Sequence, residues 1–364
     1  MARLIAVFNN KGGVGKTVLT WNIADTLARN GRRVLLIDFD PQCNLSIAVL
    51  GEGDFVSRLP TQNAPYGTTL RAYLQRFLQN TGGEELFLHR GPGTHRNVQL
   101  LAGDFWLNVY ADSLNVGADL LSGTGLAKYV VLRNIVREAE EKAGHEFDYA
   151  IIDLPPSFGA LVRATFYSSD YFIVPCTSDN FSVYCVGLIG HMIPNFVQDW
   201  QTGLSRFKSN NPHYTDFDEL GRPAFAGWIF NGFDTARERR SQAEIQAEVP
   251  QRNRRMARAD ETFHERLTRA IDTDLVSRLR REIRHYDAIA PNLIHPYMIG
   301  DIEDANVLIQ NSLWQNIPLG QLNRVNQLTA LQNRTGWSHN QLEKIELFRE
   351  KFADAADCIT RICT

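Results

Sequence analysis

A glycine-rich loop near the start of the chain contains the residue types that bind phosphate groups. The loop reads Lys-Gly-Gly-Val-Gly-Lys-Thr from Lys11 to Thr17. Its glycines allow successive backbone N–H groups to turn toward phosphate oxygens, and a helix that begins there adds the positive end of its dipole. Lys16 would then reach the β- and γ-phosphates of a nucleotide, and the Thr17 hydroxyl would bind Mg²⁺. The residues predicted to contact the nucleotide are Gly12, Gly13, Val14, Gly15, Lys16, Thr17 and Val18.

This loop differs from the phosphate-binding loop (P-loop) pattern G-x-x-x-x-G-K-T at one position, because Asn10 replaces the first glycine. The flanking segments still predict the elements that such a site needs. Residues 4–8 and 33–38 are apolar runs typical of strands buried in a parallel sheet. Residues 18–30 carry apolar side chains at helical spacing and are followed by Gly31, a helix stop. A strand–loop–helix–strand unit places the loop where parallel-sheet proteins bind nucleotides.

Three carboxylates follow predicted strands. Asp38 and Asp40 come at the end of the second apolar run, and Asp153 ends another run over 147–153. Side chains two positions apart lie on the same side of a strand, and the carboxyl ends of parallel strands face the nucleotide crevice. Carboxylates there can hold Mg²⁺-bound water or orient an attacking water. The Pro155-Pro156 pair stops the last strand and stiffens the loop after it.

These motifs resemble those of the ParA/MinD family of ATPases. The loop from Lys11 to Thr17 is similar to the family's deviant Walker A motif, and Asp-Phe-Asp-Pro-Gln at 38–42 is similar to its second motif. The segment Phe147 to Ser157 looks like its Walker B signature. Weaker similarity continues in further segments, at 98–114, 171–175, 179–182, 224–231, 302–305 and 317–318. Cys43 is a departure, since the family often has glycine there.

The resemblance implies roles for individual residues. Lys11 is expected to reach across a nucleotide-sandwiched dimer to the partner's phosphates, and Asp40 to position the hydrolytic water. Asp38 is expected in the outer shell of Mg²⁺, whereas Asp153 is expected to bond the Mg²⁺ shell directly. Asn231, at the end of the apolar segment 224–230, is expected to bond the adenine.

Composition narrows the class of protein. The 364 residues are 44% hydrophobic and 22% charged with a net charge of −3, which excludes collagen-like, disordered and coiled-coil classes. No apolar run has the length of a membrane span, and the start of the chain is too short for a signal peptide. Five cysteines without metal-ligand spacing favour a reducing cytoplasm and no disulfide framework.

The order of segments predicts a doubly wound α/β fold with a mostly parallel sheet and helical insertions. We expect one ATPase domain over 1–334, with insertions at about 51–97 and 233–290, and a C-terminal docking helix over 335–364. The first insertion is rich in turn residues, has one helical stretch around 70–78 and is expected to be a surface excursion.

The second insertion concentrates positive charge. Between Ala236 and Arg258 there are seven arginines and three glutamates, a local net charge of +4. Arginines suit phosphate contacts, which bind duplex DNA without sequence preference and in a salt-sensitive way. A solvated, salt-bridged helix pair is the alternative, since acids are interleaved with the later arginines. The candidate DNA contacts are Arg252, Arg254, Arg255 and Arg258.

The last segment predicts one amphipathic helix. Ser338 and Gln341 form a capping box, and apolar residues recur every three or four positions from Leu342 to Ile362. Five acids oppose three basic residues between 343 and 357, so anionic lipids would not attract this face. We therefore expect the helix to dock on the core or contact a dimer partner rather than a membrane.

The sequence thus predicts a cytoplasmic ATPase, associated with the nucleoid if it binds DNA, that uses ATP and Mg²⁺, forms a homodimer with ATP and hydrolyses it slowly as a switch. By resemblance, its output would be DNA partition through nonspecific duplex binding and an activating adaptor protein. Two alternatives stay open. One is a cargo- or protein-positioning ATPase that does not bind DNA, and the other is a nucleotide-gated scaffold.

Overall fold

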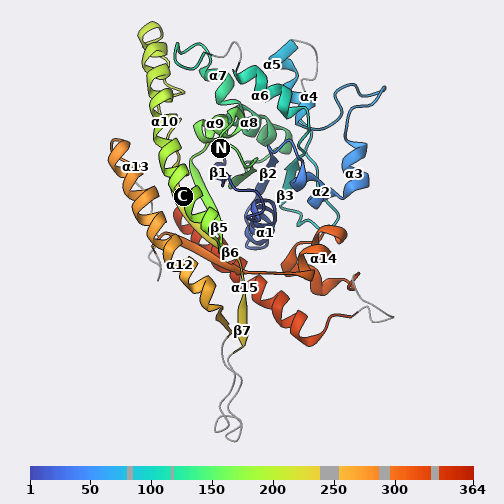
Figure 1. The fold of residues 1–364 in the computed structure, drawn as a ribbon. Coiled ribbons are helices and arrows are strands. Elements are labelled where there is room, and N and C mark those ends of the chain that lie inside the picture. The colour runs from blue at the N-terminus through green and yellow to red at the C-terminus, as the bar shows by residue number, and fades with distance from the viewer. Residues whose placement is uncertain (80–84, 116–118, 238–253, 287–295, 329–335) are drawn as a thin grey trace, which may run out of the picture.

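The computed structural model describes residues 1–79, 85–115, 119–237, 254–286, 296–328 and 336–364. Its centre is a seven-stranded sheet in the order β3-β2-β4-β1-β5-β6-β9, in which every pairing is parallel (Figure 1). The strands are β1 (Arg3–Val7), β2 (Val34–Asp38), β3 (Val98–Leu101), β4 (Tyr149–Asp153), β5 (Tyr171–Thr177), β6 (Ala224–Phe233) and β9 (Met298–Glu303). The predicted doubly wound α/β class is confirmed.

Helices cover both faces of this sheet. On one face lie α1 (Lys16–Arg29), α2 (Asn44–Leu50), α14 (Val307–Gln315), the 3₁₀-helix η2 (Leu319–Arg324) and α15 (His339–Ile362). The other face is covered by α4 (Leu70–Leu74), α6 (Leu107–Asn115), α7 (Leu126–Tyr129), α8 (Val131–Ala143), α9 (Ala160–Ser168) and α10 (Asn180–Asn210). The short helices α3 (Glu52–Ser57) and α5 (Arg76–Gln79) follow α2 and α4 in the chain.

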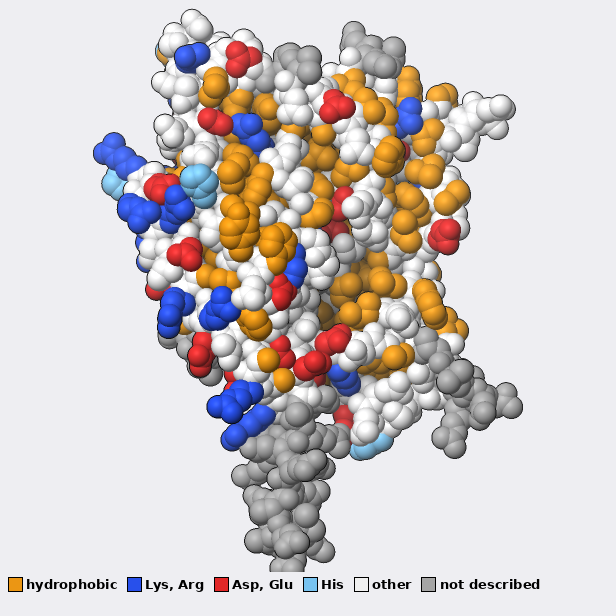
Figure 2. All heavy atoms as spheres, viewed as in Figure 1, with side chains coloured by type: hydrophobic (Ala, Val, Ile, Leu, Met, Phe, Trp, Pro, Cys, Tyr) orange, Lys and Arg blue, Asp and Glu red, His pale blue; other side chains and the backbone are white. Residues whose placement is uncertain are grey.

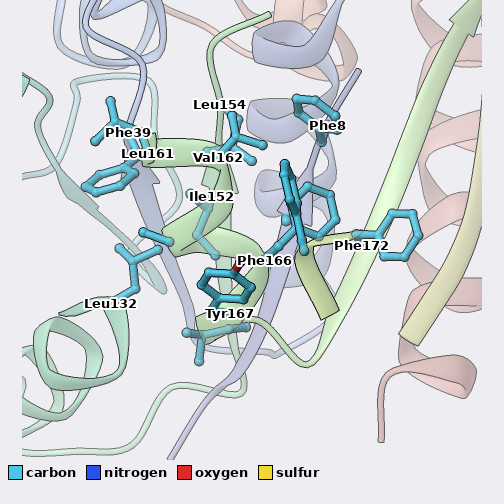
Figure 3. Close-up of a cluster of buried hydrophobic side chains, with 14 of the residues drawn as sticks. Phe8, Phe39, Leu132, Ile152, Leu154, Leu161, Val162, Phe166, Tyr167 and Phe172 are labelled. Atoms are coloured by element: carbon cyan, nitrogen blue, oxygen red, sulfur yellow. The ribbon is translucent and has the colours of Figure 1, made fainter. Parts of the chain in front are cut away.

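Strand β1 shows why these strands appear as continuous apolar runs in the sequence. Leu4, Ala6 and Phe8 belong to the core beneath α8, α9 and α10, whereas Ile5 and Val7 belong to the core beneath α1 and α15. Successive side chains of a strand point to opposite faces, and both faces are buried here. Figure 3 shows the first of these cores, where Phe8, Phe166 and Phe172 pack together.

The first insertion is not only a surface excursion, which corrects the sequence prediction. Leu70, Tyr73 and Leu74 of α4 are buried in the core, and the Leu70 N–H donates to the Ala102 carbonyl over 2.8 Å. Side chains at i, i+3 and i+4 share one face of a helix, so even this short helix buries an apolar face. The predicted stretch is two short helices, separated at Gln75.

The second insertion begins with strands, which differs from the helical insertion predicted. Strands β7 (Thr235–Arg237) and β8 (Arg254–Met256) pair antiparallel, and β7 projects away from the body of the protein beyond β6 (Figure 1). Arg254 and Arg255 are therefore on a strand. Helix α12 (Arg258–Ala270), the π-helical segment η1 (Ile271–Val276) and α13 (Ser277–Glu282) follow. The pattern of apolar residues did not distinguish a strand from a helix at the start of this insertion, because a two-stranded ribbon outside the core buries no periodic apolar face.

The C-terminal helix α15 docks on the rest of the chain. Its capping box is present, with Ser338 accepting from the Gln341 N–H and Gln341 accepting from the Ser338 N–H. Ile345, Phe348 and Phe352 are buried in the same core as α1 and β9. The apolar face predicted from the sequence is thus covered by this chain. Within the described residues, no helix combines the length and apolar character that a membrane span requires.

Candidate nucleotide site

The P-loop joins β1 to α1 at the carboxyl edge of the sheet. Gly13 and Gly15 have φ of +75° and +80°, the left-handed region that glycine enters without a Cβ clash. The Asn231 side-chain amide, at the end of β6, donates to the Val14 carbonyl over 2.9 Å. A Cβ at position 15 would overlap that amide. Glycine is therefore required at these positions for two reasons: the left-handed backbone conformation at Gly13 and Gly15, and the close approach of β6 to Gly15.

The loop folds around the ammonium group of Lys16. Lys16 Nζ donates to the carbonyls of Asn9 and Lys11, each over 3.0 Å, and the residue is 7% exposed. Burial lowers the pKa of Lys16, while the charges of Asp153 and Asp40 act in the opposite direction. A buried cation held only by neutral carbonyls is able to attract the phosphate chain of a nucleotide.

Thr17 and Asp153 meet at the first turn of α1. The Thr17 hydroxyl donates to Asp153 Oδ2 over 2.7 Å, and the other oxygen, Oδ1, is buried with no hydrogen-bond partner among the residues that the structure describes. Mg²⁺ takes oxygen ligands and is usually bound by one or two protein groups together with substrate phosphates. An unpartnered carboxylate oxygen beside a threonine hydroxyl therefore fits Mg²⁺.

Asp38 and Asp40 are in different surroundings although both follow β2. Asp38 pairs in register with Asp153 on β4, is fully buried, and accepts from the Ser46 N–H and hydroxyl over 2.7 Å and 2.6 Å. Burial, together with the charge of Asp153, raises the pKa of Asp38 to about 8. Burial and the charge of Asp40 likewise raise the pKa of Asp153 to about 7, against the hydrogen bond from Thr17.

Asp40 lines the cavity, whereas Asp38 does not. Asp40 Oδ1 accepts from the Gln42 N–H over 2.9 Å, and its carbonyl accepts from the Cys43 N–H over 2.9 Å. These bonds close a tight turn that fixes the carboxylate at the mouth of the site. Burial raises the pKa of Asp40, and the hydrogen bond from Gln42 and the charge of Lys16 lower it.

Cys43 adopts a left-handed conformation, with φ of 57° and ψ of 26°, at the start of α2. This conformation costs a residue with a side chain roughly 1–2 kcal/mol more than it costs glycine. It explains why glycine is common at this position in the family that the sequence resembles. Here the thiol is buried, and burial with the charge of Asp38 raises its pKa, so Cys43 is an inert packing residue.

A cavity of about 400 Å³ opens between the P-loop, the loop after β2 and α14. Its polar wall includes Gly13, Gly15, Lys16, Thr17, Asp40 and Gln42. The opposite wall is mostly apolar and is formed by Ile47, Ala48, Pro156 and Leu313. Sequence reasoning missed Leu313, since nothing in the pattern of α14 shows that this helix reaches α2. The Asn316 side chain makes that connection by donating to the Ile47 and Ala48 carbonyls over 3.1 Å and 3.0 Å.

Lys11 is not among the residues that line this cavity, and its side chain contacts its own chain. Lys11 Nζ donates to the Thr177 hydroxyl over 2.6 Å, to the Asp179 carboxylate, and to the Ser182 hydroxyl over 3.4 Å. Asp179 lies in a segment that resembles the family, but the sequence predicted no role for it or for Thr177. The helix-capping pattern Asp-x-x-Ser at 179–182 marks a helix start, but it does not show that a lysine of the P-loop lies beside it.

The structure brings together the predicted nucleotide residues but describes only part of the predicted DNA surface. Arg255 and Arg258 are exposed at the base of the hairpin and the start of α12. Arg252 and the side chain of Arg254 lie outside the described residues. Figure 2 shows Lys and Arg side chains gathered along the edge of the molecule formed by α12 and α13.

Comparison with known proteins agrees with this geometry. A family model described as an AAA domain matches residues 2–205, more than half of the chain. The sporulation initiation inhibitor protein Soj of Bacillus subtilis is 30% identical over 184 residues, which cover 50% of this chain and 61% of Soj. The chromosome partitioning protein ParA of Myxococcus xanthus is 28% identical over 193 residues, which cover 53% of this chain and 58% of ParA. The chain thus spans less than two thirds of the length of either relative.

Solved structures share the fold. The structure of a Corynebacterium diphtheriae protein matches with a TM-score of 0.61 at 22% identity, covering 86% of this chain and 97% of that one. The ATP complex of McdA from Cyanothece matches with a TM-score of 0.55 at 16% identity, covering 99% of this chain and 96% of McdA. With the family match and the P-loop geometry, these findings show that the chain belongs to the ParA/MinD-type P-loop ATPases.

Proposed function

We propose that this protein is a nucleotide-operated switch that binds Mg-ATP, dimerises around it and hydrolyses it slowly. The observation that supports the proposal most strongly is the cavity of about 400 Å³, where Lys16, Thr17 and Asp40 share one wall. Its volume falls within the range of small-molecule sites.

The phosphate chain would lie along the P-loop. The loop N–H groups and Lys16 would donate to phosphate oxygens, and the start of α1 would add its dipole. Asn231 is proposed to bond the adenine in addition to the Val14 carbonyl that it now contacts. Thr17 and Asp153 would hold Mg²⁺, with Asp38 behind them. When bound, Mg²⁺ neutralises the negative charge that develops on the phosphate oxygens during phosphoryl transfer.

Asp40 is the proposed positioning group for the attacking water. It lines the cavity, and its turn with Gln42 and Cys43 limits its movement. Phosphoryl transfer depends on positioning and electrostatic stabilisation more than on covalent steps by the protein. Asp40 is the one carboxylate among the described residues that line the cavity, which is consistent with slow hydrolysis. Lys11 is proposed to supply the additional positive charge to the partner subunit's nucleotide in the dimer.

We propose DNA partition as the biological output, with Arg252, Arg254, Arg255 and Arg258 contacting duplex DNA nonspecifically. The Myxococcus xanthus relative is named for chromosome partitioning, and Arg255 and Arg258 are exposed where the hairpin joins α12. An activating adaptor protein and a nucleoid-associated cytoplasmic location complete the proposal. We assign the ATPase to residues 1–334, with 335–364 as its docking helix.

The deciding experiment uses size-exclusion chromatography with light scattering on the wild-type chain and on Asp40→Ala. Each is measured without nucleotide, with ADP and with Mg-ATP, and released phosphate is recorded in parallel. We expect monomers without ATP, a stable Asp40→Ala dimer with ATP, and phosphate release that falls by roughly 100-fold in the variant. A monomer of Asp40→Ala under every condition would contradict the switch.

The proposed role in DNA partition is tested by adding duplex DNA of arbitrary sequence to the same samples. Partition predicts binding that needs ATP, weakens with salt and is lost when Arg252, Arg254 and Arg255 are all changed to Glu. ATP-dependent dimers that never bind DNA would favour a protein-positioning ATPase. Unchanged phosphate release in Asp40→Ala would favour a nucleotide-gated scaffold.

A further inference from the structure

The ammonium group of Lys11 is enclosed by side-chain oxygens of its own subunit. Its partners are Thr177 at the end of β5 and Asp179 and Ser182 at the start of α10. An ammonium group has three N–H donors, and here each has an acceptor. The Lys11 side chain is only 18% exposed. All three donors of Lys11 are therefore engaged by side chains of its own subunit.

The acceptors of Lys11 form a connected network. Asp179 Oδ2 accepts from the Thr177 hydroxyl over 2.7 Å, and the Thr177 and Ser182 hydroxyls are 2.9 Å apart. Partial burial favours the neutral form of Asp179, but hydrogen bonds from Lys11, Thr177 and the Ser182 N–H outweigh it, so its pKa is lowered. Asp179 is thus a carboxylate anion whose charge is directed at Lys11.

Asp179 also begins α10. Its Oδ1 accepts from the Ser182 N–H over 2.9 Å, which is the helix N-cap contact. One oxygen therefore caps the helix while the other bonds Lys11. The cap needs only a side-chain acceptor, which asparagine also provides, whereas the attraction to Lys11 needs the negative charge. The two roles can be separated by a single substitution.

Lys11 and Lys16 differ in how they are held. Lys16 is bound by backbone carbonyls of its own loop, so this contact depends only on the conformation of the P-loop. Lys11 is bound by side chains of β5 and α10, more than 160 positions away in the sequence. No carboxylate holds Lys16 in this way in the part of the chain that the structure describes. For the Lys11 side chain to leave its own subunit, its bonds to β5 and α10 would have to break, whereas Lys16 would keep its bonds to the loop carbonyls.

We propose that Asp179 is an autoinhibitory latch: it holds Lys11 within the free subunit and so raises the ATP concentration that dimerisation requires. The inference rests on the proposed function, in which Lys11 leaves its own subunit to reach the partner's nucleotide. Breaking a shielded, charge-assisted contact opposes that movement, and the bonds formed to phosphate offset it. The latch keeps subunits apart until nucleotide is abundant.

The first test follows dimerisation of the full chain by light scattering against the concentration of a non-hydrolysable ATP analogue. Asp179→Asn should lower the concentration for half-maximal dimerisation by roughly tenfold, the range of a hydrogen bond to a charged group. Thr177→Val, which removes one acceptor and keeps the cap, should cause a smaller shift in the same direction. Thermal unfolding of both variants confirms that α10 remains folded.

A matched control is available at the other end of α10. Lys208 Nζ donates to both oxygens of Asp218 over 2.7 Å and 2.6 Å, and the two side chains are 32% and 35% exposed. Asp218→Asn removes a comparable ion pair that the proposal does not use. It should leave the dimerisation curve unchanged. An equal shift in Asp218→Asn would overturn the latch, because the effect would then follow net charge.

The second test needs no dimer. The seven lysines are labelled with an amine-reactive reagent in the nucleotide-free chain, and rates are read by mass spectrometry. Lys11 should react several-fold faster in Asp179→Asn, and Lys208 should react faster in Asp218→Asn. Unchanged Lys11 labelling would overturn the contact itself. Faster labelling with an unchanged dimerisation curve would overturn the regulatory role. If the wild-type chain never dimerises, the proposed switch fails, and faster labelling would leave Lys11–Asp179 as a structural contact only.

Discussion

The nucleotide end of the molecule and the arginine-bearing helices α12 and α13 use charge in opposite ways. At the nucleotide end, Lys16, Asp38 and Asp153 are all less than 10% exposed, and their partners are specific atoms. Along α12 and α13 the charged side chains lie mostly at the surface, and both signs are present. Arg278 and Arg281 both bridge Glu282, which is 32% exposed.

This difference determines how much each residue contributes. Removing one partner of a buried charge leaves the other uncompensated, so the effect is large and local. Exposed charges are screened by water and salt, so each contributes little and the effects add up over many residues. Under the proposed function, the first region would bind one ligand in one geometry, and the second would bind polyanions without a fixed geometry. Four predictions test this contrast, from the largest expected effect to the smallest.

Substitution of Lys16 should have the largest effect. Lys16→Ala removes the buried cation at the centre of the P-loop, and we expect the affinity for ATP to fall by roughly 100-fold or more, since charge-assisted bonds to phosphate are lost. Isothermal titration calorimetry measures this directly. The exposed Lys142, 36% accessible and paired with Glu85, is the control. Equal losses of ATP affinity in Lys16→Ala and Lys142→Ala would contradict the expected difference between buried and exposed charges.

The backbone of the P-loop should be nearly as sensitive. Gly15→Ala forces a Cβ into both a left-handed conformation and the Asn231 amide, and we expect it to lower the free energy of unfolding by about 2–3 kcal/mol. Gly31→Ala isolates the backbone effect, because its φ is +87° and nothing lies within 4 Å. It should cost about 1 kcal/mol. Urea denaturation of the nucleotide-free chain checks both values. Similar costs would mean that the approach of β6 does not constrain the loop.

Buried carboxylates should make the nucleotide-free chain less stable at high pH. The raised pKa values of Asp153, about 7, and Asp38, about 8, mean that the folded chain keeps protons that the unfolded chain has lost. Stability present at low pH is therefore lost progressively from about pH 4, the ordinary pKa of Asp in an unfolded chain, to about pH 8, the pKa of Asp38 in the folded chain. We expect a slope on the order of 1 kcal/mol per pH unit, measured by urea denaturation. In Asp38→Asn the slope should decrease, and an unchanged slope would contradict this assignment.

Single arginines should have the smallest effects. Arg255→Ala and Arg258→Ala are each expected to weaken ATP-dependent DNA binding by about threefold, and to reduce the slope of log affinity against log salt by about one. Fluorescence anisotropy at several salt concentrations provides both numbers. A loss of DNA affinity of more than 100-fold from either substitution would show that this arginine makes a specific contact and is not one of many weak contacts on a diffuse surface.

The elements that carry the predicted nucleotide residues could be predicted from the sequence because their determinants are local. The P-loop, Asp38, Asp40 and Asp153 are recognisable from residue type and spacing within short segments, and parallel strands bring their carboxyl ends to one edge. The predictions for the insertions were weaker. Helix α4 proved to be part of the core, and the arginine-rich segment began as a β-hairpin, since short or exposed segments leave little periodic signal.

What the sequence alone determined is the family and the fold class, and it predicted the residues proposed to face the nucleotide, because these depend on backbone conformation and periodicity over about ten neighbouring positions. Only the tertiary structure decided the environment of each charge. It buried Asp38 behind Ser46 while leaving Asp40 at the cavity, placed Leu313 opposite the P-loop, and brought Asp179 to Lys11. Burial and pairing set the pKa and the mobility of a side chain, and they arise from contacts between residues far apart in the sequence.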